Sequence, residues 1–182
     1  FSLSRGLGDV YKRQDKHNEK YKFPIWNKLD VCDVGKDYKK IAIVDSDTMI
    51  HWDAPNPFGL IKSGVYGVQD NGIISCLYES VTNYGGVFFP NFKIDLDKYI
   101  NAGVVYLDNN SLSIYEKLRE FYFQNQEKLD NWNKGGGREQ TLFNYLLQIN
   151  NYDIKLMPPI WNMFAMHKKE MFSHNFQDGD DK

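Results

Sequence analysis

Short blocks of apolar residues alternate with polar stretches along this chain and predict strands and helices in turn. The clearest block is Ile41-Ala42-Ile43-Val44, which is mostly β-branched and runs directly into Asp45-Ser46-Asp47. An uninterrupted apolar run of this kind indicates a strand buried on both faces. The two carboxylates then follow the strand at the edge where ligands bind in open α/β sheets.

Asp45 and Asp47 support two interpretations. Neighbouring carboxylates repel each other unless a cation lies between them, and hard divalent cations prefer oxygen ligands. We therefore expect a metal site at the end of this strand. The alternative is that the two aspartates only cap the following turn, as Asp often does, and the pattern alone leaves both open.

The remaining periodicities predict further elements. We expect helices over residues 24–32, 112–129 and 139–147, and strands over residues 64–68, 99–108 and 152–156. The stretch 69–92 is rich in Asn, Gly, Tyr and Ser, which favours a long functional loop. Alternation of short buried strands with helices predicts an α/β fold.

The first two helices carry terminal signals. A period of 3.6 places Ile25, Leu29 and Cys32 on one face of the first helix, and Gly35 is expected to end it. Ser111 is expected to be the N-cap of the helix that follows.

Composition limits the class of protein. With 182 residues and 42% hydrophobic content the chain is expected to form one domain over residues 15–182. Residues 1–14 fit no period and are expected to be non-native or disordered. A net charge of −2 gives no field that favours nucleic acid, and no apolar run approaches the roughly 20 residues of a membrane span. Cys32 and Cys76 lack CxxC spacing, so we expect reduced thiols in a cytoplasmic protein, which could lie against a membrane in its full-length form.

Four separate stretches have the order and spacing of motifs in one enzyme family. They are the strand with its Asp-x-Asp (41–48), Asn101-Ala102-Gly103 followed by an apolar strand, Glu139-Gln140 with Asn144 on a helix, and Leu156-Met157-Pro158-Pro159 with Trp161-Asn162. On these residues the chain resembles nucleotide-sugar glycosyltransferases of the GT-A fold, and is most similar to family 8, the group of glycogenin and bacterial galactosyltransferases.

The resemblance implies a function and a cofactor. It implies transfer of a hexose from a nucleotide-diphosphate sugar, UDP-glucose or UDP-galactose, to a glycan or other hydroxyl acceptor with retention of configuration. Mn²⁺ or Mg²⁺ would be held by Asp45, Asp47 and a third ligand, which is either His174 or a residue beyond Lys182. A divalent cation there stabilises the charge that grows on the leaving diphosphate.

The resemblance also implies roles for residues around the donor sugar. Glu139 and Gln140 would act as the catalytic pair below the anomeric carbon, with Glu139 standing where the family usually has Asp. The donor sugar would be bound by Asp45, Ser46, Asn101, Ala102, Gly103 and Gln140. Family members usually carry two βα units for the uridine before the Asp-x-Asp strand. Only about 40 residues precede Asp45, so we expect this chain to be a fragment that is incomplete at its N-terminus.

Two other functions remain open. Haloacid-dehalogenase-type phosphatases and phosphotransferases also place Asp-x-Asp after a strand, with the first Asp, here Asp45, as nucleophile. That class leaves Asn101-Ala102-Gly103 and Glu139-Gln140 unexplained. The third reading is a non-catalytic sugar-binding domain of the same fold. The sequence does not predict the oligomeric state.

Overall fold

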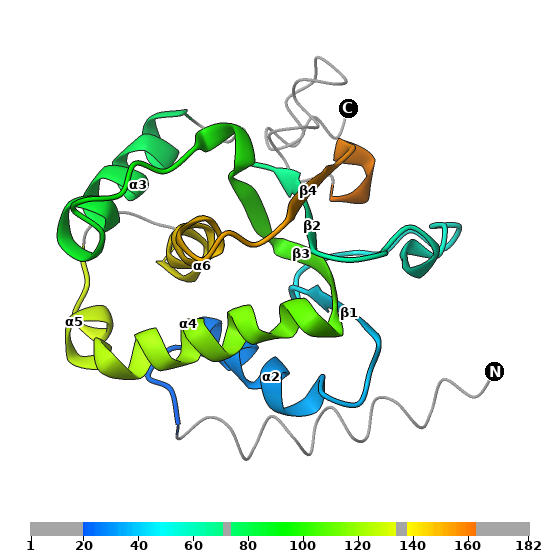
Figure 1. The fold of residues 1–182 in the computed structure, drawn as a ribbon, viewed down its shortest axis with the longest axis horizontal. Helices are drawn as coiled ribbons and strands as arrows, with labels where there is room; N and C mark the ends of the chain where they lie inside the picture. The colour runs from blue at the N-terminus through cyan, green and yellow to red at the C-terminus, as the bar shows by residue number, and fades with distance from the viewer. Residues whose placement is uncertain (1–19, 71–73, 134–137, 163–182) are drawn as a thin grey trace, which may run out of the picture.

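A four-stranded mixed sheet forms one layer of the described part of the protein, beside a layer of helices (Figure 1). The computed structural model describes residues 20–70, 74–133 and 138–162. The strands are β1 (Lys40–Val44), β2 (Val65–Gln69), β3 (Ile100–Asp108) and β4 (Ile154–Met157). Their order is β1-β3-β2-β4, with β3 antiparallel to both β1 and β2, and β4 parallel to β2. The predicted α/β class is therefore confirmed as an open mixed sheet flanked by helices.

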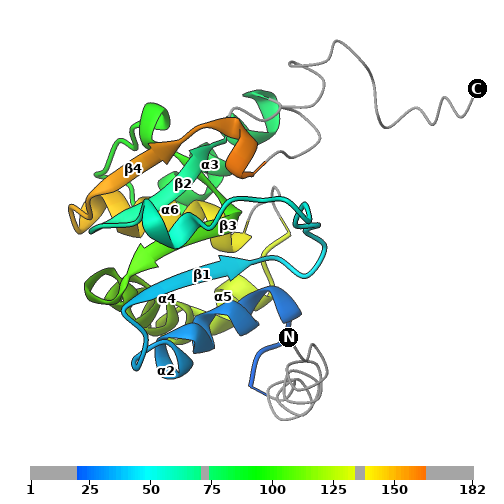
Figure 2. The same ribbon diagram turned by 90° about the vertical axis from the view of Figure 1, so that its right-hand side faces the viewer.

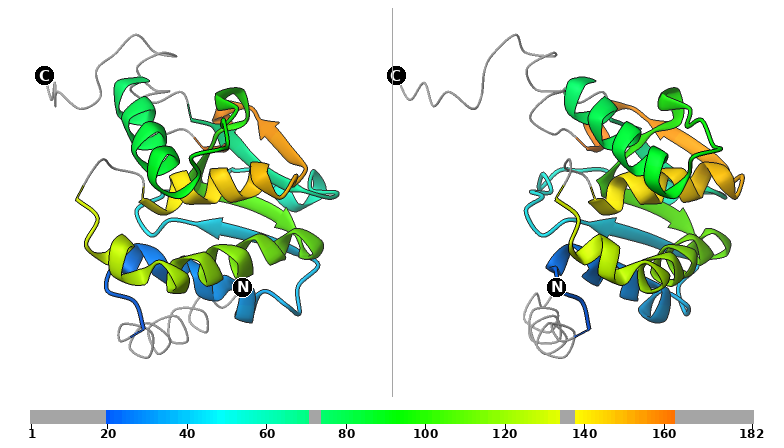
Figure 3. Two further views of the ribbon diagram at one scale, coloured as in Figure 1. Left: turned by 60° about the vertical axis from the view of Figure 1, so that its left-hand side comes forward. Right: turned by 90° about the vertical axis from the view of Figure 1, so that its left-hand side faces the viewer.

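Most of the helical structure covers one face of this sheet. The longer helices are α3 (Ile74–Phe88), α4 (Ser113–Gln124) and α6 (Arg138–Ile149), and the shorter segments are η1 (Pro24–Asp30), α2 (Val31–Val34), η2 (Pro57–Gly59), η3 (Leu96–Lys98), η4 (Asn109–Leu112), α5 (Gln126–Asp130) and η5 (Pro159–Trp161). The strands stand in front of α3, α4 and α6 in Figure 2, and the same helices stand in front of the sheet in the right panel of Figure 3. No helix among the described residues has the length and apolar character needed to cross a bilayer.

The main core fills the space between the sheet and these helices. Its largest side chains are aromatic and fully buried, including Trp26, Tyr84, Tyr122 and Phe143. Each such ring removes a large apolar area from water, which is the dominant favourable term in folding. A smaller core on the opposite sheet face contains Tyr66, Val68, Val104, Tyr106, Ile61 and Met157, against which Trp161 of η5 packs. The sheet thus has a large apolar core on one face and a smaller one on the other.

The strand before the two aspartates lies at one side of the sheet. It forms where predicted, as β1, but only Ile41 and Ile43 are buried, while Lys40, Ala42 and Val44 are exposed. The prediction of burial on both faces is wrong, because β1 is an outer strand among the described residues and its second face lies beyond the smaller core. The exposed residues Ala42 and Val44 are also apolar, so the sequence of the strand is apolar without interruption.

The first predicted helix is largely a 3₁₀ helix. Trp26, Leu29 and Cys32 are fully buried, whereas Ile25 is exposed. A 3₁₀ helix has three residues per turn, so positions 26, 29 and 32 share a face, and the face predicted from a period of 3.6 is wrong at Ile25. Gly35 ends the segment as predicted, with its amide bonded to the Val31 oxygen at 2.8 Å.

The predicted loop over residues 69–92 is also wrong, because α3 occupies most of it. Leu77, Val81, Tyr84 and Phe88 recur at helical spacing and pack against the main core. Polar residues and glycines stand between these positions, so the overall composition of the stretch is typical of a loop. Burial of one helical face outweighs the weak helix propensity of glycine.

The helix predicted over residues 112–129 divides in two. Asn125, with φ of −121°, separates α4 from α5. Ser111 is not the N-cap: it lies in η4, and its hydroxyl donates to Asp108 Oδ1 at 2.5 Å. The other predicted elements form near their expected positions, as β2, β3, α6 and β4.

Candidate functional site

Several strand and helix ends meet on one side of the sheet. Asp45 follows β1 and Asp70 follows β2, while Asn101 lies at the start of β3 and Gln140 in the first turn of α6. The C-terminal end of β1 and the N-terminal end of α6 lie on the same side in Figure 2. Because β3 runs antiparallel to β1 and β2, its first residues lie beside the last residues of those strands.

The backbone of residues 101–104 departs from regular pairing with β2. Gly67 pairs with Val105 but Gln69 pairs with Ile100, so the register shifts between these points. A shift of this kind frees backbone groups from the strand ladder. The amide of Ala102 donates instead to a side chain, Gln140 Oε1, at 3.0 Å. The small residues Ala102 and Gly103 therefore lie at an irregularity within β3.

An ammonium group joins two of the predicted site carboxylates. Lys28 Nζ, from η1, lies 2.6 Å from Asp45 Oδ1 and 2.8 Å from Glu139 Oε1. It also donates to the Ala102 oxygen at 3.1 Å. All three N–H groups of the ammonium are thereby used, and the ion cluster connects η1, the end of β1 and the start of α6.

Burial and charge act in opposite directions on Lys28. Its side chain is 17% exposed, Glu139 is 8% exposed and Asp45 is 34% exposed. Burial opposes the charged ammonium, but attraction to Glu139 and hydrogen bonds to both carboxylates outweigh it and raise the pKa of Lys28 above its ordinary value. The lysine stays charged at neutral pH, and the cluster carries one net negative charge when both carboxylates are ionised.

A second group of contacts connects three polar side chains. Asp70 Oδ2 accepts from Gln140 Nε2 at 2.7 Å and from Asn101 Nδ2 at 3.3 Å. Since Gln140 also accepts from the Ala102 amide, both ends of its side-chain amide are fixed. These side chains are half-buried, so they are held in place and still reach solvent. Such a surface of donors and acceptors suits a ligand that carries several hydroxyl groups.

Asn101 connects this network to the segment after β4. Its Oδ1 accepts from the Gly103 amide at 2.8 Å and from Asn162 Nδ2 at 2.9 Å. A Cβ added at Gly103 would lie 2.9 Å from Asn101 Oδ1 and 3.2 Å from Asp45 Oδ2. Only glycine leaves room here for both side chains, and its carbonyl oxygen also accepts from the Asp45 amide at 2.8 Å.

Buried polar groups behind the site hold α6 in position. The Thr141 hydroxyl lies 2.7 Å from Ser80 Oγ and 2.9 Å from the Tyr99 hydroxyl. Asn144 accepts from the Ile100 amide and donates to the Ile100 oxygen, each at 2.8 Å. Glu139 and Gln140 are one helical turn or less from these contacts, so their side chains start from a fixed backbone.

The residues present fit a divalent cation in the nature of their donor atoms. Asp45 and the exposed Asp47 supply carboxylate oxygens, the ligand type that Mg²⁺ and Mn²⁺ prefer. Within residues 20–70, 74–133 and 138–162, no three His, Cys, Asp or Glu side chains group closely enough to hold a metal. A cation at this position would need ligands beyond these two aspartates, and would compete with Lys28 for Asp45.

The structure brings most of the predicted site residues together. Asp45, Asn101, Ala102, Gly103, Glu139 and Gln140 belong to the connected contacts described above. Ser46 and Asp47 lie in the exposed turn after β1. His174 and residues 1–14 lie outside the described residues.

Three further residues of the site were not predicted. Asp70 directly follows the buried strand β2, the same signal that identifies Asp45. Asn162 belongs to the fourth motif, to which no role was assigned. Lys28 lies in a helical segment, and only the fold shows that it points to two carboxylates 17 and 111 positions away.

Comparisons of the chain with family models, with curated proteins and with solved structures found no match.

Proposed function

We propose that this chain is a glycosyltransferase domain of the GT-A fold that transfers a hexose from a nucleotide-diphosphate sugar, UDP-glucose or UDP-galactose, to a glycan or other hydroxyl acceptor. Transfer proceeds with retention of configuration and depends on Mn²⁺ or Mg²⁺. The observation that carries the proposal is that Asp45, Asn101, Gln140 and Asn162, one from each of the four motifs, lie in one set of contacts around Lys28 and Asp70.

The two halves of the site suit the two halves of such a donor. Asp45, at the end of β1, supplies carboxylate oxygens for a divalent cation, and a diphosphate would be bound through that cation. Asp70, Asn101 and Gln140 offer paired donors and acceptors, as recognition of sugar hydroxyls requires. A site that hydrogen-bonds a hydroxyl group discriminates strongly against an analogue that lacks it.

Glu139 and Gln140 carry the side-chain groups that the transfer reaction requires. As the bond between the sugar and the diphosphate breaks, negative charge develops on the diphosphate and positive charge develops on the sugar ring. A carboxylate or amide oxygen beneath the ring stabilises the positive carbon. When bound, a divalent cation held by Asp45 and Asp47 would neutralise the diphosphate charge.

Hydrolysis of a panel of UDP-sugars, with and without Mn²⁺, tests the proposal. It is measured by UDP release on this chain. We expect Mn²⁺-dependent release with one or two donors. Asp47→Asn is expected to abolish it, whereas Asp53→Asn, an exposed aspartate farther along the same loop, should leave it unchanged.

Two outcomes would contradict the proposal. The first is that the folded chain neither binds nor turns over any nucleotide sugar. The second is hydrolysis of a generic phosphate ester through an aspartyl-phosphate at Asp45, which would identify a phosphatase or phosphotransferase instead. Binding of sugars without any transfer would favour the non-catalytic sugar-binding domain.

A further inference from the structure

An open hollow lies at the junction of α4 and α5, outside the candidate site. It has a volume of about 690 Å³, and the described residues that line it come from the stretch 123–133. None of the site residues named above lines it. The stretch ends at Asn133, six positions before Glu139, so the hollow lies on the chain segment that leads into the candidate site.

The break between the two helices creates this surface. Asn125 interrupts α4, and its side-chain Nδ2 donates to the Phe121 oxygen at 2.9 Å. Asn131 does the same at the end of α5, with its Nδ2 bonded to the Glu127 oxygen at 2.9 Å. These bonds fix the two amides in orientation before any ligand arrives, which reduces the entropy that binding would cost.

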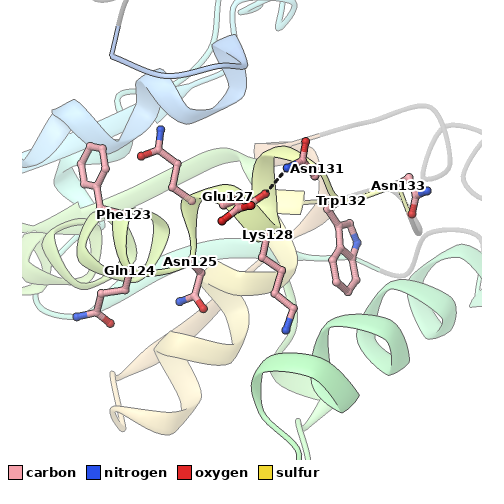
Figure 4. A pocket seen from close by; sticks show the side chains of 9 residues that line it. Phe123, Gln124, Asn125, Glu127, Lys128, Asn131, Trp132 and Asn133 are labelled. Carbon is pink, nitrogen blue, oxygen red and sulfur yellow. Dashed lines mark hydrogen bonds between the residues drawn. The ribbon is translucent and has the colours of Figure 1, made fainter.

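Aromatic rings stand on either side of these amides, as Figure 4 shows for Phe123 and Trp132. Phe123 is 43% exposed, and its ring stacks on Tyr21 with centroids 5.8 Å apart. Trp132 is anchored in the core against Tyr84, with ring centroids 4.9 Å apart. Both rings are therefore held rigidly, and Phe123 offers an accessible apolar surface.

Among the described residues, the charged side chains that line the hollow are one acid, Glu127, and one base, Lys128. The Lys128 ammonium lies over the Phe88 ring at 5.0 Å. Amides supply most of the remaining polar groups, from Gln124, Asn125, Gln126, Asn131 and Asn133. Side-chain amides both donate and accept hydrogen bonds without carrying charge. The lining thus favours an uncharged, hydroxyl-rich ligand over a phosphate or nucleic acid.

We propose that the hollow between Phe123 and Trp132 binds a neutral glycan. The sugar rings lie with their C–H faces against the exposed Phe123 ring, and their hydroxyls bond to the amides. This inference rests on the residues of α4 and α5 and does not depend on the proposed transfer reaction.

Native gel electrophoresis through soluble neutral polysaccharides tests the inference. Separate gels contain glycogen, a galactan or a mannan, and dextran sulfate serves as the charged comparison. We expect retardation by at least one neutral polysaccharide and none by dextran sulfate. Phe123→Ala should weaken retardation about two- to tenfold, the effect of losing one aromatic contact, and Gln124→Ala should weaken it as well.

Tyr78→Ala is the matched control, because Tyr78 is an aromatic residue that is 64% exposed on α3 and does not line the hollow. It should leave retardation unchanged, and circular dichroism shows that each variant is folded. No retardation by any neutral polysaccharide would overturn the inference. Equal retardation of wild type, Phe123→Ala and Gln124→Ala, or retardation by dextran sulfate alone, would also overturn it.

Asp45→Asn separates this inference from the proposed function. We expect this variant to lose UDP-sugar hydrolysis and to keep its retardation by the polysaccharide. If wild type hydrolyses no donor and is still retarded, the proposed function fails and the glycan site stands. If donors are hydrolysed without any retardation, the glycan site fails alone.

Discussion

Replacement of Asn144 by leucine removes the side chain that joins α6 to the first residue of β3. Asn144 is fully buried, and its amide makes one 2.8 Å bond to the Ile100 N–H and one to the Ile100 oxygen. It thereby takes the place of a neighbouring strand. Leucine has a similar volume and no polar atom, so both backbone groups of Ile100, itself 0% exposed, would lose their partner.

The expected magnitude follows from those two groups. A buried donor or acceptor left without a partner costs about 1–3 kcal/mol, so the free energy of unfolding should fall by about 2–6 kcal/mol. A domain of this kind has about 5–15 kcal/mol in total. With a urea m-value of about 2 kcal/mol/M, the midpoint of unfolding should fall by about 1–3 M.

Urea titration followed by tryptophan fluorescence measures this midpoint, since Trp26 and Trp132 are buried. Asn150→Ala is the matched control. Asn150 lies just past the end of the same helix and is exposed, and its side chain donates to the Leu146 oxygen one turn earlier. Its loss should cost less than about 0.5 kcal/mol. Equal midpoints for the two variants would refute the reasoning that Ile100 depends on Asn144.

Three further perturbations test other parts of the fold. Gly64 has a φ of 97°, and a Cβ there would collide with the Asp153 backbone oxygen, so Gly64→Ala should cost about 1–3 kcal/mol. Gly59→Ala, in open space, should cost less than about 0.5 kcal/mol, and equal Tm values by scanning fluorimetry would contradict this. Burial acts to raise the pKa of Asp108, but the hydrogen bonds that it accepts outweigh burial and lower it. The ionised Asp108 carboxylate therefore stabilises the fold above its ordinary pKa, and this contribution is lost as pH falls below about 4. The urea midpoint of Asp108→Asn should therefore fall less than that of wild type between pH 5 and 3, and parallel curves would argue against it. Lys28→Met leaves two carboxylates without their ammonium and should cost about 2–4 kcal/mol at pH 7; a urea midpoint equal to that of wild type would show that the ion cluster contributes nothing to stability.

The sequence predicts the elements whose period or boundary is local. The helix α6 follows from Leu142, Phe143 and Leu146, and all three are buried. The end of the first helical segment follows from Gly35. Each of these signals lies within one or two turns of the element it specifies, so no tertiary information is needed.

Errors occur where packing decides between local alternatives. Composition around Gly85 and Gly86 favours a loop, but burial of Tyr84 against Trp132 and Phe88 selects a helix. Ile25 satisfies a period of 3.6, yet the segment adopts three residues per turn and buries Trp26 instead. Only the arrangement of the neighbouring helices separates these outcomes.

Some residues of the candidate site have a local signal in the sequence, and others do not. Asp45 was identified by its place after an apolar run, and Asp70 has the same signal after β2. The role of Lys28 has no local signal, because its partners are set by the packing of η1 beside α6. Sequence can thus identify the polar residues at strand ends, while the pairing among them depends on the fold.

The span of the ion cluster along the chain has a consequence for folding kinetics. Lys28 and Glu139 are 111 positions apart, and Asn101 and Asn162 are 61 positions apart. Loops of that length must close before either contact forms, so the cluster has no stable precursor in a short segment. The site should therefore assemble late. Exchange of the Ala102 and Gly103 amide hydrogens with solvent deuterium should then proceed through opening of the whole domain, and not through local fluctuation.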